Sequence, residues 1–447
     1  MPPANGAETL AWESSPGRAL LALAGPTTLS LLSFACMGIV DTLFVSKLGA
    51  ATLAGVGLGL VVTNFLGSFA FGLLRGVKVL LAQARGNDAR SRVLVGAGVL
   101  VALQLGIGMA ALGELTALVV SRFCATPEAG AAARSYIAVR CLGMPVLLIY
   151  VALREARYGY GETRSPLTSA LIGNVTHALL DYVALFVLGW GAAGAALANI
   201  LSFALQAGLL WLAQNETGFT FGAQARKARI EIARAGAFTG LQFVLEMGSL
   251  AALSLLLAGM SDLQMAAHQI AVQLAAFCFL PAMAIAESAT VLAAEAYGHA
   301  RFVAVHAVAR AARRLGLAYA ALCGLTLIAG GGVIAGWFTR ETALTAVVRT
   351  VLVTVAAHQL FQSLALGSHG VLRGVGAARF SAMCSLACAW LCTPWLGYLL
   401  ARHLELGAAG VWIAHAVEMA IASFTLARYF ERGSWQRTQG APRESMA

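Results

Sequence analysis

Charged side chains are scarce in this chain of 447 residues, where they make up 11% of the sequence. A soluble domain carries about 25%. Hydrophobic residues account for 59% of the chain. This composition excludes an ordinary soluble globular protein and predicts a protein that resides in a lipid bilayer.

Several motifs of enzymes and ATPases are also absent. The chain has no phosphate-binding G-x-x-x-x-G-K-[ST] loop, so ATP drive within it is unsupported. HEXXH and G-x-S-x-G are missing, which argues against a membrane protease or esterase. The eight cysteines fall almost entirely within apolar runs, so we expect neither a disulfide framework nor a metal site from them.

Long apolar runs dominate the sequence instead. A membrane-spanning helix needs about 20 apolar residues, and the alternating strands of a β-barrel read differently. Twelve segments qualify as helices, at 19–46, 50–80, 93–119, 134–153, 166–189, 191–213, 235–260, 264–293, 312–338, 346–372, 380–401 and 407–430. The predicted fold class is an all-α integral membrane protein with twelve transmembrane helices.

Lys and Arg are distributed unevenly between the two sides of these helices. The N-terminus, the even-numbered loops and the C-terminal tail hold 21 of the 30, and the odd-numbered loops hold 7. Positive residues favour the cytoplasmic side, so both termini are predicted to be cytoplasmic. This bias accounts for the net charge of +10 without nucleic-acid binding. The first apolar run is too long for a cleavable signal peptide.

The two halves of the chain resemble each other. AQARG at 82–86 recurs as AEAYG at 294–298, and GAAGAALAN at 191–199 recurs as GAAGVWIAH at 407–415. These offsets span six helices, an even number, so the halves are predicted to be parallel repeats. The predicted parts are a polar cytoplasmic N-terminus 1–17, an N-lobe 18–214, a cytoplasmic linker 215–234, a C-lobe 235–430 and a cytoplasmic tail 431–447, disordered from 433.

Two acids lie deep in apolar runs. Asp41 lies 15 residues past Pro26, and Asp181 lies 15 residues past Pro166. At 1.5 Å per residue, each climbs about 22 Å and reaches the same outer half of the membrane. The candidate proton or cation site also includes residues on the same helical stripe as Asp181 or at matching depth, namely Asn174, His177 and Asn199.

Paired acids in such a place favour proton exchange. Two carboxylates cannot both ionise cheaply in a low-dielectric pocket, and a nearby histidine titrates near neutrality. The alternative is a satisfied polar network that only holds helices together. Intramembrane acids are rare and often mark ion or proton paths, so we favour the functional interpretation.

Further polar or flexible side chains are candidates for substrate binding. Glu246 lies near the middle of the seventh segment, and the whole set is Glu246, Gln242, Met37, Gln362 and His358. Arg75 and Lys78 are expected either to snorkel or to line a cavity. Glu418 is expected to be interfacial or structural.

At this point the chain resembles the multidrug and toxic compound extrusion (MATE) transporters over about residues 15–430. The motifs that carry the resemblance are AGPTTLSLLSFACMGIVDTLFVSKLG, LLAQARG, YIAVRCLGMP, GYGETRSPL, GNVTHALLD, AAHQI, GVLRGVGAARF and LGAAGVWIA. The resemblance implies two six-helix lobes arranged as a V, no cofactor, a monomer, and drug efflux driven by entry of Na⁺ or H⁺.

The N-lobe pattern is most similar to the DinF-like branch of that family. In that branch the cation site has an acid on the first helix, matched by Asp41, and one on the fifth, matched by Asp181. His177 stands where the branch has Asn, and Asn199 where it has Thr. Imidazole offers nitrogen, whereas Na⁺ prefers oxygen ligands, so protons are the expected coupling ion. Glu246 resembles the acid on the seventh helix of the NorM-like branch.

The hypothesis from the sequence is a proton-coupled antiporter of the bacterial inner membrane that exports amphipathic, cationic compounds. The alternatives are a lipid or glycolipid flippase of related architecture, an integral-membrane enzyme that uses His177 with Asp181, and a scaffold that transports nothing. A broad cationic cavity would favour the flippase, and Arg75 with Lys78 leave that option open.

Overall fold

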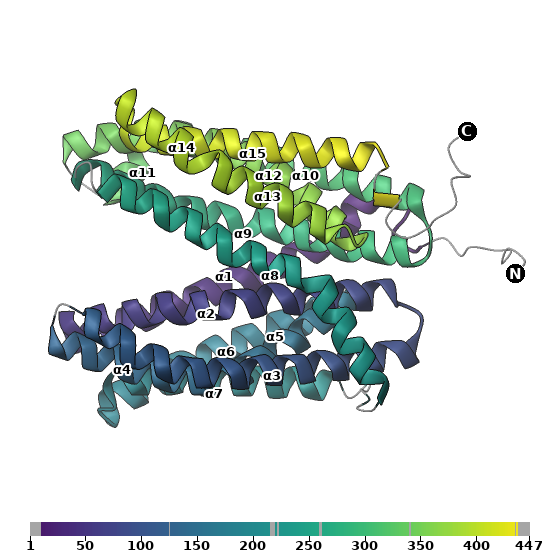
Figure 1. Cartoon of the computed structure of the whole chain (residues 1–447), viewed down its shortest axis with the longest axis horizontal. Coiled ribbons are helices and arrows are strands. Elements are labelled where there is room, and N and C mark those ends of the chain that lie inside the picture. The colour runs from purple at the N-terminus through teal and green to yellow at the C-terminus, as the bar shows by residue number, and fades with distance from the viewer. Residues whose placement is uncertain are drawn as a thin grey trace, which may run out of the picture. The chain divides into compact units, whose positions relative to one another are not determined.

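The computed structural model describes residues 10–124, 126–214, 220, 223–258, 262–338, 341–433 and 435–436. All regular structure in these residues is helical (Figure 1). Ten helices are long and apolar enough to cross a membrane, and the bent pair α4 (Pro127–Leu142) and α5 (Met144–Gly159) counts as an eleventh. With α8 (Ala223–Ala258), which is not among these, they occupy the twelve predicted segments. The predicted all-α membrane fold is confirmed.

The chain divides into two compact units. One unit comprises Pro26–Gly248, and the other comprises Met1–Gly25 with Ser249–Ala447. The division falls inside α1 (Pro16–Val45) at Pro26, which has no N–H for the helix ladder, and inside α8. Each helix therefore contributes its two parts to different units. The predicted linker 215–234 is helical from Ala223 onward.

The Pro26–Gly248 unit is a bundle whose helices run side by side in Figure 1. Its core is built by α2, α3, α5 and α7, with fully buried side chains such as Leu74, Leu148 and Phe203. The elements besides α1, α4, α5 and α8 are η1 (Ser46–Leu48), α2 (Ala50–Gln83), α3 (Asp88–Val120), η2 (Ser121–Phe123), α6 (Arg164–Tyr182), the π-helix η3 (Val183–Val187) and α7 (Gly191–Gln214).

Glycines allow α2 and α8 to approach closely within this unit. A Cβ at Gly236 would lie 1.8 Å from the carbonyl oxygen of Leu73, and one at Gly72 would lie 2.5 Å from the Cα of Gly240. Neither position has room for a larger residue. Small residues let membrane helices approach backbone to backbone, which positions the residues of α8 that follow.

The other unit is built around α12, which packs against α9, α10 and α15. Its elements besides the first part of α1 and the last part of α8 are α9 (Asp262–Gly298), α10 (Phe302–Ala329), α11 (Gly331–Phe338), α12 (Thr342–Gly374), α13 (Ala378–Leu391), α14 (Thr393–Tyr398), the π-helix η4 (Leu399–His403) and α15 (Gly407–Glu431).

The internal repeat is visible in the backbone. The π-helices η3 and η4 each have five residues and begin 216 positions apart, the offset already seen between GAAGAALAN and GAAGVWIAH. Each is followed by a glycine with φ of 55°, Gly191 in one unit and Gly407 in the other. Two units with the same irregularity at the same place support a duplicated architecture.

Segments near both ends of the chain belong to the fold. Trp12 donates a hydrogen bond from Nε1 to Glu295 at 2.9 Å, and Arg301 lies 2.7 Å from Glu13. Trp435 is fully buried and stacks on Phe430. The prediction of disorder from residue 433 is therefore wrong for Trp435, because one large aromatic ring in a polar segment is enough to anchor it. Residues 437–447 lie outside the described part.

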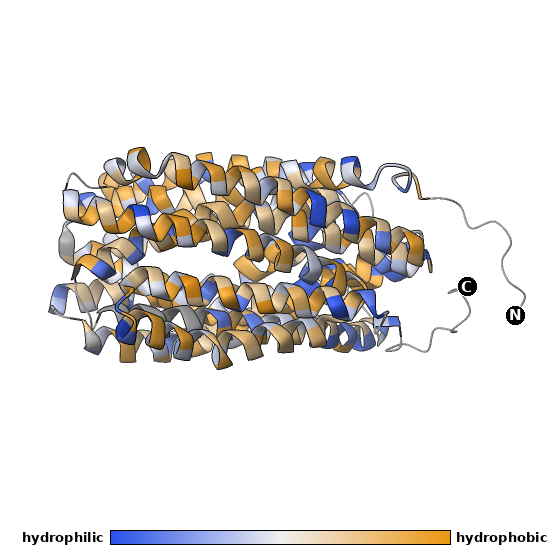
Figure 2. Cartoon of the chain, turned by 90° about the horizontal axis from the view of Figure 1, so that it is seen from above, coloured by the Kyte–Doolittle hydropathy of each residue, from blue (hydrophilic) through white to orange (hydrophobic). Residues whose placement is uncertain are grey.

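Hydrophobic residues cover the middle of the helices, and hydrophilic residues gather near helix ends (Figure 2). Large apolar side chains such as Trp337, Leu391 and Trp395 are more than 70% exposed. Their exposure is favourable in lipid, which solvates apolar side chains.

Candidate functional site

Two aspartates and a histidine meet inside the Pro26–Gly248 unit. Asp41 lies on α1, and His177 and Asp181 lie one turn apart on α6. Their relative exposures are 5%, 0% and 0%. His177 Nε2 lies 2.9 Å from Asp41 Oδ1 and 3.3 Å from Asp181 Oδ2. One imidazole nitrogen therefore bridges carboxyl groups from two helices.

The two predicted asparagines behave differently. Asn199 on α7 is buried and donates from Nδ2 to Asp41 Oδ2 at 3.5 Å. Asn174 instead donates to the backbone carbonyl of Ser33 on α1 at 2.5 Å, and it also contacts the Ser33 hydroxyl. The structure thus brings four of the five predicted residues together, while Asn174 holds α6 against α1 about one turn away.

The cluster contains more acid than base. Two ionised carboxylates beside a neutral imidazole would carry two negative charges in a buried place, which is costly. Neither Asp181 oxygen nor His177 Nδ1 has a satisfactory hydrogen bond to another described residue. Within the described residues, no other three His, Cys, Asp or Glu side chains come within 4.8 Å of one another. The arrangement is suited to take up and release protons.

Tyr136 on α4 is a neighbour that the sequence reasoning missed. Its ring is 1% exposed, and its phenol lies within electrostatic range of Asp41, Asp181 and Arg140. Arg140 lies one turn further along the same helix, with its guanidinium carbon 5.9 Å from the Tyr136 ring centre. The signal in the sequence was the YIAVRC motif, where a tyrosine and an arginine stand four residues apart in an apolar segment.

Three of the predicted substrate residues belong to the same unit as the cluster. Met37 is buried in the core one turn before Asp41 on α1. Gln242 on α8 is 6% exposed and donates from Nε2 to Glu246 Oε1 at 2.7 Å. The half-buried Glu246 is therefore positioned by its own helix, one turn from Gln242.

The other two predicted substrate residues, His358 and Gln362, lie on α12 in the second unit. His358 is buried, with its ring centre 5.4 Å from that of Trp412 and 5.6 Å from that of His415. The Gln362 side-chain oxygen is buried without a hydrogen bond to another described residue.

Glu418 on α15 is more deeply placed than an interfacial residue. It is 3% exposed and accepts hydrogen bonds from Thr393 Oγ1 at 2.5 Å and His415 Nδ1 at 3.1 Å. The prediction that Glu418 is interfacial is wrong in its depth, because the position of an acid near a helix end does not reveal which donors surround it.

Lys78 and Arg75 on α2 neither snorkel freely nor act alone. Lys78 is 1% exposed, and its Nζ lies 2.9 Å from Glu155 Oε2 on α5. Arg154 lies 3.2 Å from the other oxygen of Glu155. The Arg75 guanidinium carbon lies 4.6 Å from the Phe243 ring centre. This charge network packs α2 against α5.

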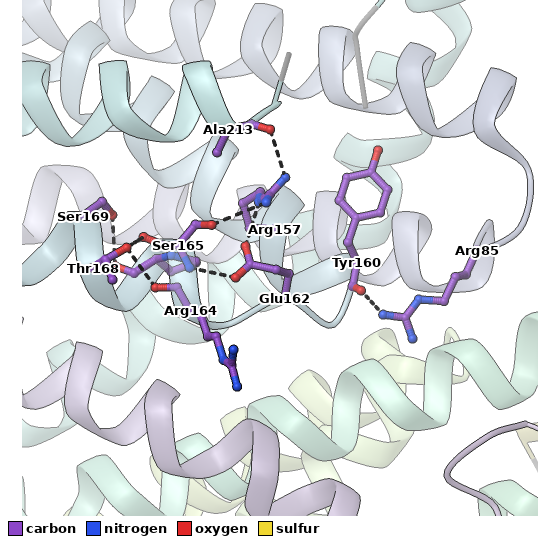
Figure 3. Close-up of polar contacts among 10 residues, drawn as sticks. Arg85, Arg157, Tyr160, Glu162, Arg164, Ser165, Thr168, Ser169 and Ala213 are labelled. Atoms are coloured by element: carbon purple, nitrogen blue, oxygen red, sulfur yellow. Dashed lines mark hydrogen bonds and ion pairs between the residues drawn. The ribbon is translucent and has the colours of Figure 1, made fainter. Parts of the chain in front are cut away.

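The GYGETRSPL motif forms a hydrogen-bonded turn between α5 and α6 (Figure 3). Glu162 accepts from Arg157 at 2.8 Å and from the Ser165 backbone N–H at 2.7 Å. Partial burial alone would raise the pKa of Glu162, but the hydrogen bonds from Ser165 and Arg157 lower this pKa below its usual value. Arg85 donates to the carbonyl of Tyr160 and ties the α2–α3 connection to this turn.

Comparisons with known proteins agree with this architecture. The family model MatE matches residues 26–183 and 239–399. A probable multidrug resistance protein NorM of Pseudomonas aeruginosa is 29% identical, covering 95% of this chain and 91% of that protein. Protein DETOXIFICATION 44, chloroplastic, of Arabidopsis thaliana is 26% identical, covering 91% of this chain and 80% of that protein.

Solved structures share the fold. The Vibrio cholerae MATE transporter VcmN in the bent form superposes with a TM-score of 0.86 at 19% identity, covering 96% of this chain and 99% of that one. An outward-facing multidrug resistance MATE family transporter gives a TM-score of 0.86 at 19% identity, covering 96% and 100%.

Proposed function

Because the chain belongs to the MatE family, we propose that it is a secondary antiporter that exports amphipathic, cationic compounds in exchange for protons. Family relatives and structural neighbours are transporters rather than enzymes. The observation that carries the proposal is the buried contact of His177 with Asp41 and Asp181. A buried ionisable cluster in a membrane protein is a functional site by default.

Proton binding would change the charge of the cluster. Without added protons the two carboxylates repel each other, and only one imidazole nitrogen faces both. Protons from outside would neutralise this repulsion and favour one packing of α1 against α6, and their release toward the cytoplasm would favour the other. A ligand shifts such an equilibrium only by its difference in affinity for the two states.

Protons fit the cluster better than Na⁺ does. Na⁺ requires several oxygen ligands around it. Here the imidazole of His177 lies between the carboxyl groups, and the amide of Asn174 is engaged by Ser33. The side chains that remain offer few oxygens around a common centre.

A cationic substrate fits the acidic and amphipathic residues near the cluster. Glu246, held by Gln242, supplies a half-buried negative charge, and Met37 supplies an adaptable apolar surface. The flippase alternative relied on Arg75 and Lys78 as cavity cations. Lys78 is instead buried in an ion pair with Glu155, which weakens that alternative.

We also propose that the protein acts as a monomer in the bacterial inner membrane with both termini in the cytoplasm. The bias of Lys and Arg toward the N-terminus, the even-numbered loops and the tail supports this orientation. The bacterial NorM relatives support the compartment.

The test uses the purified chain in proteoliposomes loaded with a fluorescent amphipathic cation. Efflux should follow an imposed pH gradient and not an imposed Na⁺ gradient, and Asp41→Asn should abolish it. Asp88→Asn makes the same change at an exposed residue in the first turn of α3 and should transport like wild type. Retained pH-driven efflux in Asp41→Asn would reject the site, Na⁺ drive alone would reject the coupling ion, and no response to either would favour the flippase.

A further inference from the structure

A cavity of about 290 Å³ lies in the second unit between α10, α12 and α15. One stripe of α10 supplies its basic residues, because His306, Arg310 and Arg313 follow one another at spacings of four and three. Leu364 and Phe430 are among the apolar residues on its other sides. The cavity therefore joins a basic edge to an apolar floor.

The basic edge carries excess positive charge. Arg313 lies 3.4 Å from Glu431, but both side chains are at least half exposed, so this pair is weak. Arg310 lines the cavity and forms no ion pair with another described residue. With one acid and two guanidinium groups, the lining attracts an anion and repels the cations that we propose as exported substrates.

The apolar floor is rigid. The ring of His306 lies 4.9 Å from that of Phe430, and Phe430 stacks on the buried Trp435 at 5.6 Å. These aromatic contacts fix the end of α15 beside α10. A ligand would meet a preformed surface, which reduces the entropy that binding costs.

The cavity lies at the level of helix ends. α15 ends at Glu431 and α12 ends at Gly374, three residues past Val371, and all of Val371, Phe430 and Glu431 line the cavity. α10 begins at Phe302, about one turn before His306. Phospholipid head groups occupy this depth in a bilayer. The distribution of Lys and Arg predicts this side to be cytoplasmic, where anionic lipids are abundant.

We propose that this cavity binds an anionic phospholipid, with the phosphodiester on Arg310 and Arg313 and the first acyl carbons against Leu364 and Phe430. Guanidinium groups bind phosphate oxygens through paired, charge-assisted hydrogen bonds. Basic pockets between membrane helices on the cytoplasmic side are known to accept such head groups. A free phosphate would use the arginines but leave the apolar floor uncovered.

The experiment measures binding of short-chain lipids to the purified full-length protein by native mass spectrometry and calorimetry. Dihexanoyl phosphatidylglycerol should bind saturably and more tightly than dihexanoyl phosphatidylcholine or inorganic phosphate. The variant with Arg310→Gln and Arg313→Gln should bind it about 30-fold more weakly, since each arginine near a head group contributes about a tenfold part of that or less. Arg314→Gln, an exposed neighbour that does not line the cavity, should bind like wild type.

A second variant guards against a folding defect in the double arginine variant. Ala427→Leu keeps both arginines and fills part of the cavity, so it should also weaken lipid binding. Equal lipid binding in wild type and both cavity variants would overturn the proposal. Inorganic phosphate that binds as tightly as the lipid would mean a free-anion site and would equally overturn it. Neither result depends on whether transport is driven by protons.

Discussion

Replacing one member of the Lys78–Glu155 pair should reveal how a buried charge network holds α2 against α5. Both side chains are almost completely buried, and their charged atoms lie 2.9 Å apart. Removing one partner of a buried ion pair costs about 3–5 kcal/mol, because the other charge is left uncompensated. The geometry around Glu155 makes the two single substitutions unequal.

The inequality comes from Arg154, which lies 3.2 Å from Glu155. Lys78→Met leaves Glu155 with this arginine, so we expect a loss of about 1–3 kcal/mol, below the range for a lone buried charge. Glu155→Gln leaves two cations without their shared acid, so we expect the full range of about 3–5 kcal/mol. The double variant should be closer to Lys78→Met, with a coupling energy of about 2 kcal/mol.

The assay is the free energy of unfolding in bicelles for wild type, both single variants and the double variant. Lys47→Met, at an exposed lysine, serves as a matched control and should change stability by no more than about 0.5 kcal/mol. If the two single losses simply add in the double variant, the residues act independently and the reasoning is refuted. A larger loss for Lys78→Met than for Glu155→Gln would refute the role given to Arg154.

Three further predictions concern other parts of the chain. His177→Asn, which supplies the residue found in the DinF-like branch, should make efflux respond to Na⁺ in the same proteoliposomes; continued proton drive alone would show that the imidazole does not exclude Na⁺. The lowered pKa of Glu162 means that its stabilisation is present above its unfolded pKa and is lost as pH falls through the folded pKa. Hydrogen exchange at the Ser165 amide should therefore lose protection in acid in wild type and show no such step in Glu162→Gln. Trp435→Ala should lower the free energy of unfolding by about 3–5 kcal/mol, measured by equilibrium unfolding, and an unchanged value would mean that the ring is not part of the core.

Helix rise made the main site predictable from the sequence. Asp41 and Asp181 stand equally far along two helices that start on the same side, so a fixed 1.5 Å per residue places them at one depth. His177 follows because it lies one turn from Asp181. The same stripe argument did not place Asn174, because a residue seven positions from Asp181 has rotated far enough to face Ser33 instead.

Partners across helices were not predictable in the same way. Lys78 and Glu155 are 77 positions apart, and hydropathy alone gives no hint that they meet. Trp435 was hidden by its polar neighbours, since composition averages over a segment while burial depends on one ring. Tyr136 was hidden for the opposite reason, because an aromatic residue is unremarkable within an apolar helix.

The repeat explains why polar groups occur at equivalent positions in both units but with different chemistry. The offset of 216 shared by η3 and η4 relates His177 to Thr393, Asn199 to His415 and Ser202 to Glu418. In the second unit the acid, Glu418, receives hydrogen bonds from both of these counterparts. Asp181 has no comparable donors and faces a second carboxyl group. A carboxylate satisfied by two donors has little to gain from a proton, whereas a crowded acid pair gains much, so we assign coupling to the first unit.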